Sequence, residues 1–133
     1  MSSSSEPNWL DFRLIRSAQV RQIEMFGGLD GIKDEELIHS AIARPQQLLH
    51  YGDPKPDLFA LAASYAFGLV KNHAFLDGNK RIAHVGYRLF LRKNGYLCPA
   101  SDEEKYRKMI ALASSDITEE DFAQWLREVC IKG

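Results

Sequence analysis

The fold is decided by the stretch Leu58-Phe-Ala-Leu-Ala-Ala-Ser-Tyr-Ala-Phe-Gly-Leu-Val-Lys71, which is apolar on nearly every face. Ser64 is almost the only polar side chain before Lys71, and Asp57 stands in front of the stretch as a good N-cap residue. A helix that is apolar all round is buried in a globular protein. Its length of about 14 residues is short of the roughly 20 residues that cross a bilayer. We therefore expect a central helix around which the other helices pack.

The segment that follows this helix, His73-Ala-Phe-Leu-Asp-Gly-Asn-Lys-Arg81, has the composition of a phosphate site. A turn that leads into a helix N-terminus offers unpaired N–H groups and a positive dipole end. Lys80 and Arg81 add positive charge there. Asp77 is a hard oxygen ligand suited to Mg2+, which usually arrives with a nucleotide. His73 is the residue whose ordinary pKa lies nearest neutrality, so we expect it to act as the general base.

Each of these residues also has a structural explanation. A single histidine after an apolar helix is usually a core or cap residue, and a Lys-Arg pair is usually solvated surface. Asp77 could cap the helix that begins near Asn79, and Gly78 and Asn79 could be turn residues only. The combination of these groups within nine residues favours the functional interpretation of the segment.

The other helices are predicted from stop signals, caps and apolar spacing. A helix is expected from about Trp9 to Phe26, and a second starts at Asp34 and ends ahead of Pro45. Residues 44–56 contain three prolines and a Gly-Asp pair, which predicts an irregular excursion or a small hairpin. Later helices are predicted from the apolar repeat that begins at Ile82, a Ser101–Glu104 capping box and a cap at Thr118. No convincing strand run is present, so we expect an all-α domain of about six helices.

Length and composition restrict the class of protein. A chain of 133 residues is the length of one domain, and we assign a disordered leader to residues 1–8 and the domain to residues 9–133. The net charge of -1 gives no reason to expect nucleic acid or a membrane surface as a partner. Cys98 and Cys130 have no metal-type spacing and favour a reducing compartment. The first residues lack the features of a signal peptide, so a cytoplasmic location is expected.

The segment 73–81 resembles the signature of the Fic/Doc family, His-Pro-Phe-x-Asp/Glu-Gly-Asn-Gly/Lys-Arg. Lys80, where most Fic enzymes carry glycine, resembles the Doc branch, the toxin of bacterial toxin–antitoxin pairs. Further similarity lies at Phe26-Gly-Gly28, Gly31-Ile-Lys-Asp34 and Asn94-Gly-Tyr96, so that it covers nearly the whole chain. Ala74 replaces the usual proline, and His84 stands where the AMP-transferring enzymes have a second arginine.

The resemblance implies a nucleotide-dependent reaction on a protein hydroxyl. It implies ATP as substrate and Mg2+ at Asp77, with His73 as base and Lys80 and Arg81 as catalytic cations. The nucleotide phosphates would be bound by Gly78, Asn79, Lys80, Arg81 and His84. A flap beside the active site would dock the target protein through Gln46, Gln47, His50 and Tyr51, although a plain surface loop explains these residues equally well.

Three functions remain open at this point. The first is a Doc-like toxin that transfers the terminal phosphate of ATP to a translation factor, and Lys80 and His84 favour it. The second is transfer of AMP to a protein hydroxyl. The third is a non-catalytic helical binding module, such as a nucleic-acid-binding domain, suggested only by the short helices and the stripe of Arg81, Arg88 and Arg92. The self-inhibiting motif of some Fic proteins is incomplete at Ser115–Glu119, so we expect a separate antitoxin whose disordered tail folds into a groove of this domain.

Overall fold

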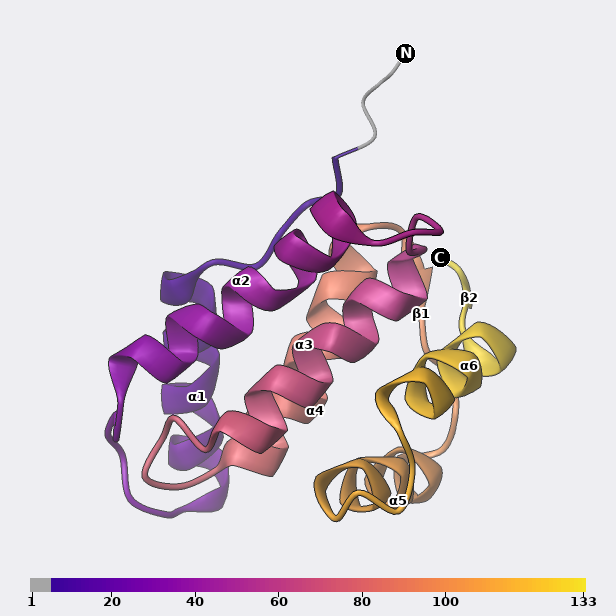
Figure 1. Cartoon of the computed structure of the whole chain (residues 1–133). Helices are drawn as coiled ribbons and strands as arrows, with labels where there is room; N and C mark the ends of the chain where they lie inside the picture. The colour runs from indigo at the N-terminus through magenta and orange to yellow at the C-terminus, as the bar shows by residue number, and fades with distance from the viewer. Residues whose placement is uncertain (1–5) are drawn as a thin grey trace.

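The structure is a computed structural model that describes residues 6–133. The first five residues of the predicted leader lie outside the described residues. The described part has six helices and one pair of two-residue strands, which confirms the predicted all-α class (Figure 1). The elements in chain order are α1 (Phe12–Phe26), α2 (Glu35–Tyr51), α3 (Leu58–Asn72), α4 (Asn79–Lys93), β1 (Tyr96–Leu97), α5 (Asp102–Ala113), α6 (Glu119–Val129) and β2 (Ile131–Lys132).

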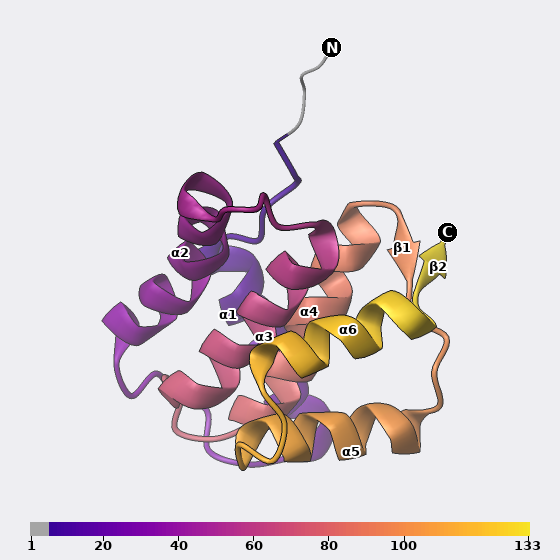
Figure 2. The same ribbon diagram turned by 45° about the vertical axis from the view of Figure 1, so that its right-hand side comes forward.

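Helix α3 is the centre of the domain, as its apolar sequence predicts. Nine of its residues, from Leu61 to Val70, are buried. It packs most extensively against α4, and then against α2 and α6. Helices α1 and α2 lie on one side of the α3–α4 pair, and α5 and α6 lie on the other (Figures 1 and 2). The hydroxyl of Tyr65 on α3 accepts a hydrogen bond from the N–H of Leu10 at 3.0 Å, so the segment before α1 is also attached to this helix.

Two glycines allow the central helices to approach closely. A Cβ atom at Gly86 of α4 would lie 2.7 Å from Leu69 Cδ1, and one at Gly68 of α3 would lie 3.2 Å from Ala41. Both distances are shorter than ordinary carbon contacts, so a larger residue would push α3 away from α4 or α2. The position of the loop that joins α3 to α4 therefore depends on these contacts.

The predicted excursion at residues 44–56 is wrong for its first half. Helix α2 continues through Pro45 to Tyr51, and only residues 52–57 are non-helical. Proline inside a helix removes one hydrogen bond and crowds the preceding turn. Here Pro45 is buried, and Leu48 and Leu49 pack against the core in the following turn. We attribute the continuation of the helix to this apolar burial, which outweighs the local preference of proline.

Two smaller expectations also differ from the structure. Asn8, the last residue of the predicted leader, is bound to Asn94 and to the carbonyl of Lys93, so this end of the leader is attached to the domain. The short ladder between β1 and β2 was not predicted, because two-residue strands have no periodicity to detect. Ser101 caps α5 as expected, whereas the Glu104 carboxylate accepts from Trp125 Nε1 at 2.6 Å.

Candidate active site

The candidate site is formed by two loops that meet at one end of the helical core. The segment 73–81 forms the α3–α4 loop and the start of α4, and the α1–α2 loop crosses it (Figure 1). The carbonyl of Ala74 accepts from the N–H groups of Lys33 and Asp34, at 2.8 and 3.1 Å. Ile32 and Phe75 form an isolated antiparallel bridge. These backbone bonds hold the signature loop in one conformation, and the buried ring of Phe75 anchors it to the core.

His73 ends α3 in the left-handed conformation, with φ 50° and ψ 48°. This conformation is uncommon for residues other than glycine, asparagine and aspartate. The histidine side chain is exposed, while the next residue, Ala74, is buried. The backbone of His73 is thus fixed by the rigid central helix on one side and by a buried residue on the other. Its imidazole is presented to solvent at the start of the loop, where a substrate hydroxyl can reach it.

Asp77 does not cap α4. Its Oδ2 atom accepts from the N–H of Leu29 at 3.2 Å, across the two loops. A Cβ atom at Gly28 would lie 3.0 Å from the same oxygen, so a glycine there makes room for the carboxylate. The side chain of Asp77 is exposed, and its second oxygen has no partner among residues 6–133. One free carboxylate oxygen fits Mg2+, which is usually held by one or two carboxylates together with substrate phosphates and water.

Helix α4 begins without a side-chain cap. Gly78 is its N-cap residue, with φ 78°, and it has no side chain that could accept a hydrogen bond from the helix. The Asn79 side chain is turned back to the loop, where it accepts from Phe75 N at 3.1 Å and donates to Phe75 O at 3.0 Å. Among residues 6–133, the first N–H groups of α4 therefore have no side-chain acceptor. The other five helices each have one, from Asp11, Asp34, Asp57, Ser101 and Thr118.

The two cations of the signature differ in their surroundings. Lys80 is exposed and forms no ion pair within the described residues. Arg81 donates to the carbonyl of Gly27 at 3.3 Å, and its guanidinium lies 5.3 Å from the centre of the Phe26 ring. Arg81 thus connects the start of α4 to the end of α1. Lys80 is the charge that is free to turn toward an anion.

His84 lies one turn further along α4 and is half-buried. Its Nε2 atom lies 3.1 Å from Arg88 Nη1. Burial, together with the positive charges of Arg88 and Lys105, lowers the pKa of His84 to about 4. The imidazole is therefore neutral at neutral pH and accepts from Arg88. To attract phosphate by positive charge, His84 would have to be protonated, and its surroundings disfavour that proton. The structure therefore gives little support to a phosphate-binding role for His84.

A cavity of about 470 Å³ adjoins the start of α4. Its wall combines the cations of the signature with apolar side chains of α1 and α5. The residues that line it are Gln22, Phe26, Lys80, Arg81, His84, Asp102, Tyr106, Met109 and Ile110. Phe26 and Tyr106 are both more than half exposed, at 60% and 65%. The cavity therefore offers aromatic surface directly beside positive charge.

The predicted docking flap does not lie beside this site. Gln46, Gln47, His50 and Tyr51 belong to the last two turns of α2, whose first turn is the end near the signature. A residue 11 or more positions along a helix is displaced by about 16 Å or more. Figure 1 shows the end of α2 at the opposite side of the molecule from the α3–α4 loop. Placing these residues next to the active site is wrong, because the helix continues through Pro45.

The segment that does cover the signature loop is the α1–α2 loop, residues 27–34. Besides the bonds to Ala74, its Gly31 carbonyl accepts from Leu76 N at 3.1 Å. The sequence predicts helix ends on both sides of this segment and a family resemblance within it, but no contact with the signature. The signal for its role was the glycine series Gly27, Gly28 and Gly31, all of which have positive φ. Such glycines allow a chain to pass close to another backbone.

A family comparison agrees with this geometry. A model of the Fic/DOC family matches residues 9–91, which includes both loops and the first four helices. The chain belongs to the Fic/DOC family. The match ends inside α4, so β1, α5, α6 and β2 lie outside it.

Two curated relatives carry the Doc name. "Toxin Doc" of Mycolicibacterium smegmatis is 41% identical over 70 residues, which are 53% of this chain and 54% of the relative. "Protein kinase doc" of Escherichia phage P1 is 38% identical over 73 residues, 55% of this chain and 57% of the relative. The chain thus spans about half the length of the curated relatives it matches.

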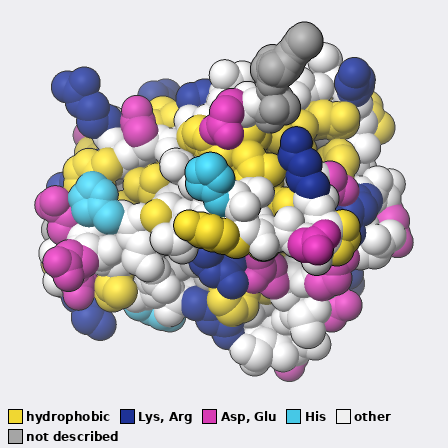
Figure 3. All heavy atoms as spheres, turned by 45° about the horizontal axis from the view of Figure 1, so that its top comes forward, with side chains coloured by type: hydrophobic (Ala, Val, Ile, Leu, Met, Phe, Trp, Pro, Cys, Tyr) yellow, Lys and Arg dark blue, Asp and Glu magenta, His cyan; other side chains and the backbone are white. Residues whose placement is uncertain are grey.

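One face of the molecule carries charges of both signs. Figure 3 shows a face on which acidic and basic side chains are interspersed, with apolar side chains between them. Among residues 6–133 no group of three or more His, Cys, Asp or Glu side chains is placed to hold a metal ion. No described helix combines the length and the apolar character that a membrane crossing requires.

Proposed function

We propose that this chain is a Doc-type toxin that transfers the γ-phosphate of ATP to a hydroxyl group of a target protein, a translation factor. The observation that carries the proposal is the uncapped start of α4. Its free N–H groups and Lys80 belong to the first turn of α4, and the loop directly before them carries Asp77 and the exposed imidazole of His73. A helix N-terminus of this kind binds phosphate oxygens. The relatives named "Toxin Doc" and "Protein kinase doc" support both parts of the proposal.

The residues of the site have distinct roles in such a transfer. His73 removes the proton from the target hydroxyl as its oxygen attacks the γ-phosphorus, and ADP leaves. The N–H groups at the start of α4 and the ammonium of Lys80 stabilise the charge on the transferred group. Asp77 would hold Mg2+, which neutralises charge on the nucleotide phosphates when it is bound. Arg81 positions the start of α4 against α1 through Gly27, and it can contact a phosphate if that contact is released.

Lys80 favours transfer of the γ-phosphate over transfer of AMP. A glycine at this position would let an inner phosphate lie against the helix start, with the α-phosphorus toward the target. The lysine side chain occupies that space and holds phosphate at the distance of its ammonium group. The neutral His84 supplies no second cation for the AMP-transferring orientation. Both features favour an orientation with the γ-phosphate nearest to His73.

The test is to supply ATP labelled at the α- or the γ-phosphate to purified protein and a bacterial lysate, and to follow the label into protein. We expect γ-label only. His73→Asn should reduce the transfer by about 10²- to 10⁴-fold, and asparagine tolerates the left-handed backbone at this position. Lys80→Gly should lose γ-transfer, and Lys80→Gly with His84→Arg should show weak α-transfer. Transfer of α-label by the wild type would establish AMP transfer instead, and no transfer at all would favour a binding module.

A toxin of this kind needs an inhibitor from another chain. We propose a small antitoxin protein whose disordered tail folds as a helix into a groove of this domain. The cavity between α1, α4 and α5 supports this proposal, because its exposed aromatic residues and the cations of the signature line one continuous surface. A helix placed there would cover Lys80 and block the phosphate site.

A further inference from the structure

Two cysteines face each other at the C-terminal ladder. Strands β1 and β2 are antiparallel, and Leu97 lies opposite Ile131. One residue further along the same register, Cys98 lies opposite Cys130. Both are free thiols and both are half-buried. Their segments lie beyond the part of the chain that the family model matches.

The register also fixes the type of pair that the cysteines form. The N–H of Gly133 donates to the carbonyl of Gly95 at 2.9 Å. These two residues therefore form a hydrogen-bonded pair of the ladder, and the next hydrogen-bonded pair lies two residues further along each strand. The cysteines fall between such pairs, and the N–H of Cys130 is bonded within α6, to Leu126 O. Residues opposite each other at such positions have Cα atoms about 4.5 Å apart and side chains close together. A disulfide requires Cα atoms about 4.4 to 6.8 Å apart.

From this placement we infer that Cys98 and Cys130 form a redox-active dithiol site, which closes reversibly to a disulfide by exchange with an anionic low-molecular-weight disulfide of the glutathione class. The closed form would join the end of β1 directly to the end of α6. The inference does not depend on the proposed kinase activity, because none of the residues involved belongs to the signature.

The surroundings of the pair favour thiolate chemistry at Cys98. The hydrogen bond with Cys130 is the largest cause that lowers the pKa of Cys98 to about 7; burial opposes it, and the charges of Lys105 and Arg88 add to it. The same hydrogen bond, together with burial, raises the pKa of Cys130. Lys105 is only 6% exposed and forms no ion pair within residues 6–133, so its charge acts on the sulfurs. A thiolate near neutral pH beside a second thiol is the usual arrangement of an exchanging pair.

Access and charge indicate the class of oxidant. Cys98 lines a surface cavity of about 240 Å³ together with Arg88, Arg92, Tyr96, Leu97 and Pro99. Arg92 is exposed and has no ion-pair partner among the described side chains. Two guanidinium groups at the opening attract an anion and disfavour a cation. A disulfide that carries carboxylates, as oxidised glutathione does, fits this opening best.

The exchange is balanced in two steps. The Cys98 thiolate attacks one sulfur of the small disulfide, whose S–S bond breaks, and the departing thiolate takes a proton from water. Cys130 then loses its proton and attacks the Cys98 sulfur, which releases the second small thiol. Two cysteine thiols are oxidised by two electrons in total, and one disulfide is reduced to two thiols. Reduced glutathione reverses both steps.

The experiment follows both thiols of the reduced full-length chain. At pH 7 we expect iodoacetamide to alkylate Cys98 about tenfold faster than Cys130. Incubation with oxidised glutathione should produce an intramolecular Cys98–Cys130 peptide, detected by mass spectrometry without reduction. Cys130→Ser should stop at the mixed disulfide on Cys98. Cys98→Ser should leave Cys130 largely unreacted over the same time.

Arg92→Gln supplies the matched control for the oxidant. It should slow the reaction with oxidised glutathione several-fold and leave the reaction with cystamine, a cationic disulfide, as fast or faster. Exclusive labelling of Cys130, or free thiols at every glutathione ratio, would overturn the inference. A disulfide only between two chains would overturn it as well. If a serine variant loses its helical circular dichroism, the wild-type peptide map and the alkylation ratio decide the question on their own.

Discussion

His84 shows how the surroundings of one residue change its chemistry. On α4 it occupies the place of a second phosphate-binding arginine, yet burial and the charges of Arg88 and Lys105 lower the pKa to about 4. Its neutral imidazole faces the Arg88 guanidinium. A proton on His84 would therefore be buried beside two cations. The free energy needed to protonate His84 in the folded chain should therefore appear as a pH dependence of stability.

We expect His84 to make the fold less stable as pH falls from about 6.5 to about 4. In that range the unfolded chain binds a proton at His84 and the folded chain does not. Protonation therefore stabilises the unfolded chain and lowers the free energy of unfolding. Above this range neither state is protonated, and below it both are. After allowance for solvent screening of a half-exposed group, the loss is about 1 to 2 kcal/mol. Urea unfolding of the wild type and of His84→Gln, which keeps an acceptor for Arg88, measures it. Parallel stability curves for the two proteins between pH 4 and 7 would contradict the assignment.

The residues of the candidate site could be singled out from the sequence because they are close together in it. His73, Asp77 and Lys80 lie within eight consecutive residues, in the α3–α4 loop and the first turn of α4, so their proximity needs no tertiary information. The neutrality of His84 could not be predicted, since it depends on Lys105, which comes from another helix. The bond between Asp77 and Leu29 is also a contact between distant segments. Residue types suggested which groups to consider, and the fold determines which of them are charged and free of protein partners.

At the scale of the element, α4 is distinguished by its start. The helix has basic residues in its first turn and no side-chain acceptor at its N-cap. Both features are unfavourable for helix stability, because positive charge opposes the dipole and N–H groups stay unpaired. A bound phosphate would remove both disadvantages together. We therefore regard the start of α4 as adapted to a ligand, with stability supplied by the buried face of the helix.

Gly78 provides a direct test of the phosphate position. Its φ of 78° is tolerated by asparagine and aspartate, so Gly78→Asn and Gly78→Asp differ mainly in charge. The aspartate should repel phosphate and weaken ATP binding by about tenfold or more relative to asparagine, while melting temperatures of the two variants stay close. Calorimetric titration with ATP and Mg2+ measures both affinities, and the difference should shrink at high salt. Equal affinities at low salt would show that the phosphates lie elsewhere.

Helix α2 shows the limit of local rules at this scale. Proline and the residue before it usually mark a helix end, and no local pattern around Pro45 indicates that the helix continues past it. The continuation depends on apolar contacts of the turns that follow, which only the packed molecule contains. The start of α2, by contrast, was predicted correctly, because Asp34 caps Glu36 N through a contact between near neighbours. Helix caps depend on residues that are near neighbours in the sequence and were predicted well. The length of this helix depends on tertiary contacts.

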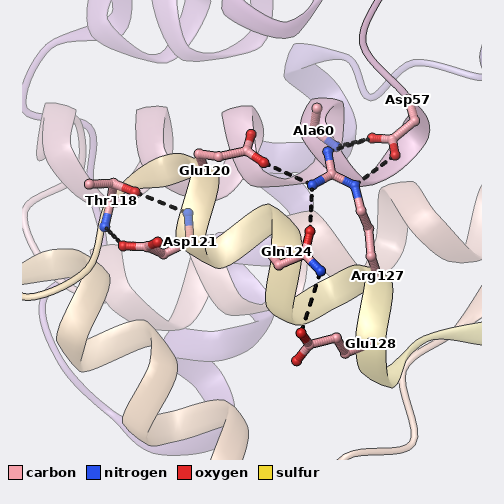
Figure 4. Close-up of polar contacts among 8 residues, drawn as sticks. All are labelled: Asp57, Ala60, Thr118, Glu120, Asp121, Gln124, Arg127 and Glu128. Carbon is pink, nitrogen blue, oxygen red and sulfur yellow. Dashed lines mark hydrogen bonds and ion pairs between the residues drawn. The ribbon is translucent and has the colours of Figure 1, made fainter.

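At the scale of the whole molecule, α5 and α6 must be held against the core that carries the signature. Figure 4 shows the contact that attaches α6 to α3. Arg127 binds Asp57 through two hydrogen bonds, Nε to Oδ2 at 2.8 Å and Nη2 to Oδ1 at 3.1 Å, and it also contacts Glu120 at 2.9 Å. Asp57 at the same time caps α3 by accepting from Ala60 N. One carboxylate therefore serves both the central helix and the attachment of the last helix.

The charge of Asp57 is maintained by this arrangement. Burial alone would raise the pKa of Asp57, but hydrogen bonds from Arg127 and Ala60 outweigh burial and leave the pKa below its ordinary value. The stabilisation is therefore present at neutral pH and is lost as pH falls through this lowered pKa. The sequence predicted Asp57 as a cap, and it could not predict Arg127 as its partner, which is 70 positions away.

A double-mutant cycle with Asp57→Asn and Arg127→Gln should show coupling between α3 and α6. Asparagine keeps an acceptor for Ala60 N, so the single change mainly removes the charge pair and leaves the cap. Because the pair is bidentate but partly exposed, we expect a coupling of about 1 kcal/mol in urea unfolding at pH 7. Glu120→Gln with Arg127→Gln is the matched comparison, and its coupling should be smaller, since the Glu120 side chain is 73% exposed. At a pH low enough to protonate Asp57 the first coupling should disappear. Coupling near zero at pH 7 would mean that apolar packing of Phe122 and Leu126 alone attaches α6, and that the ion pair only follows from it.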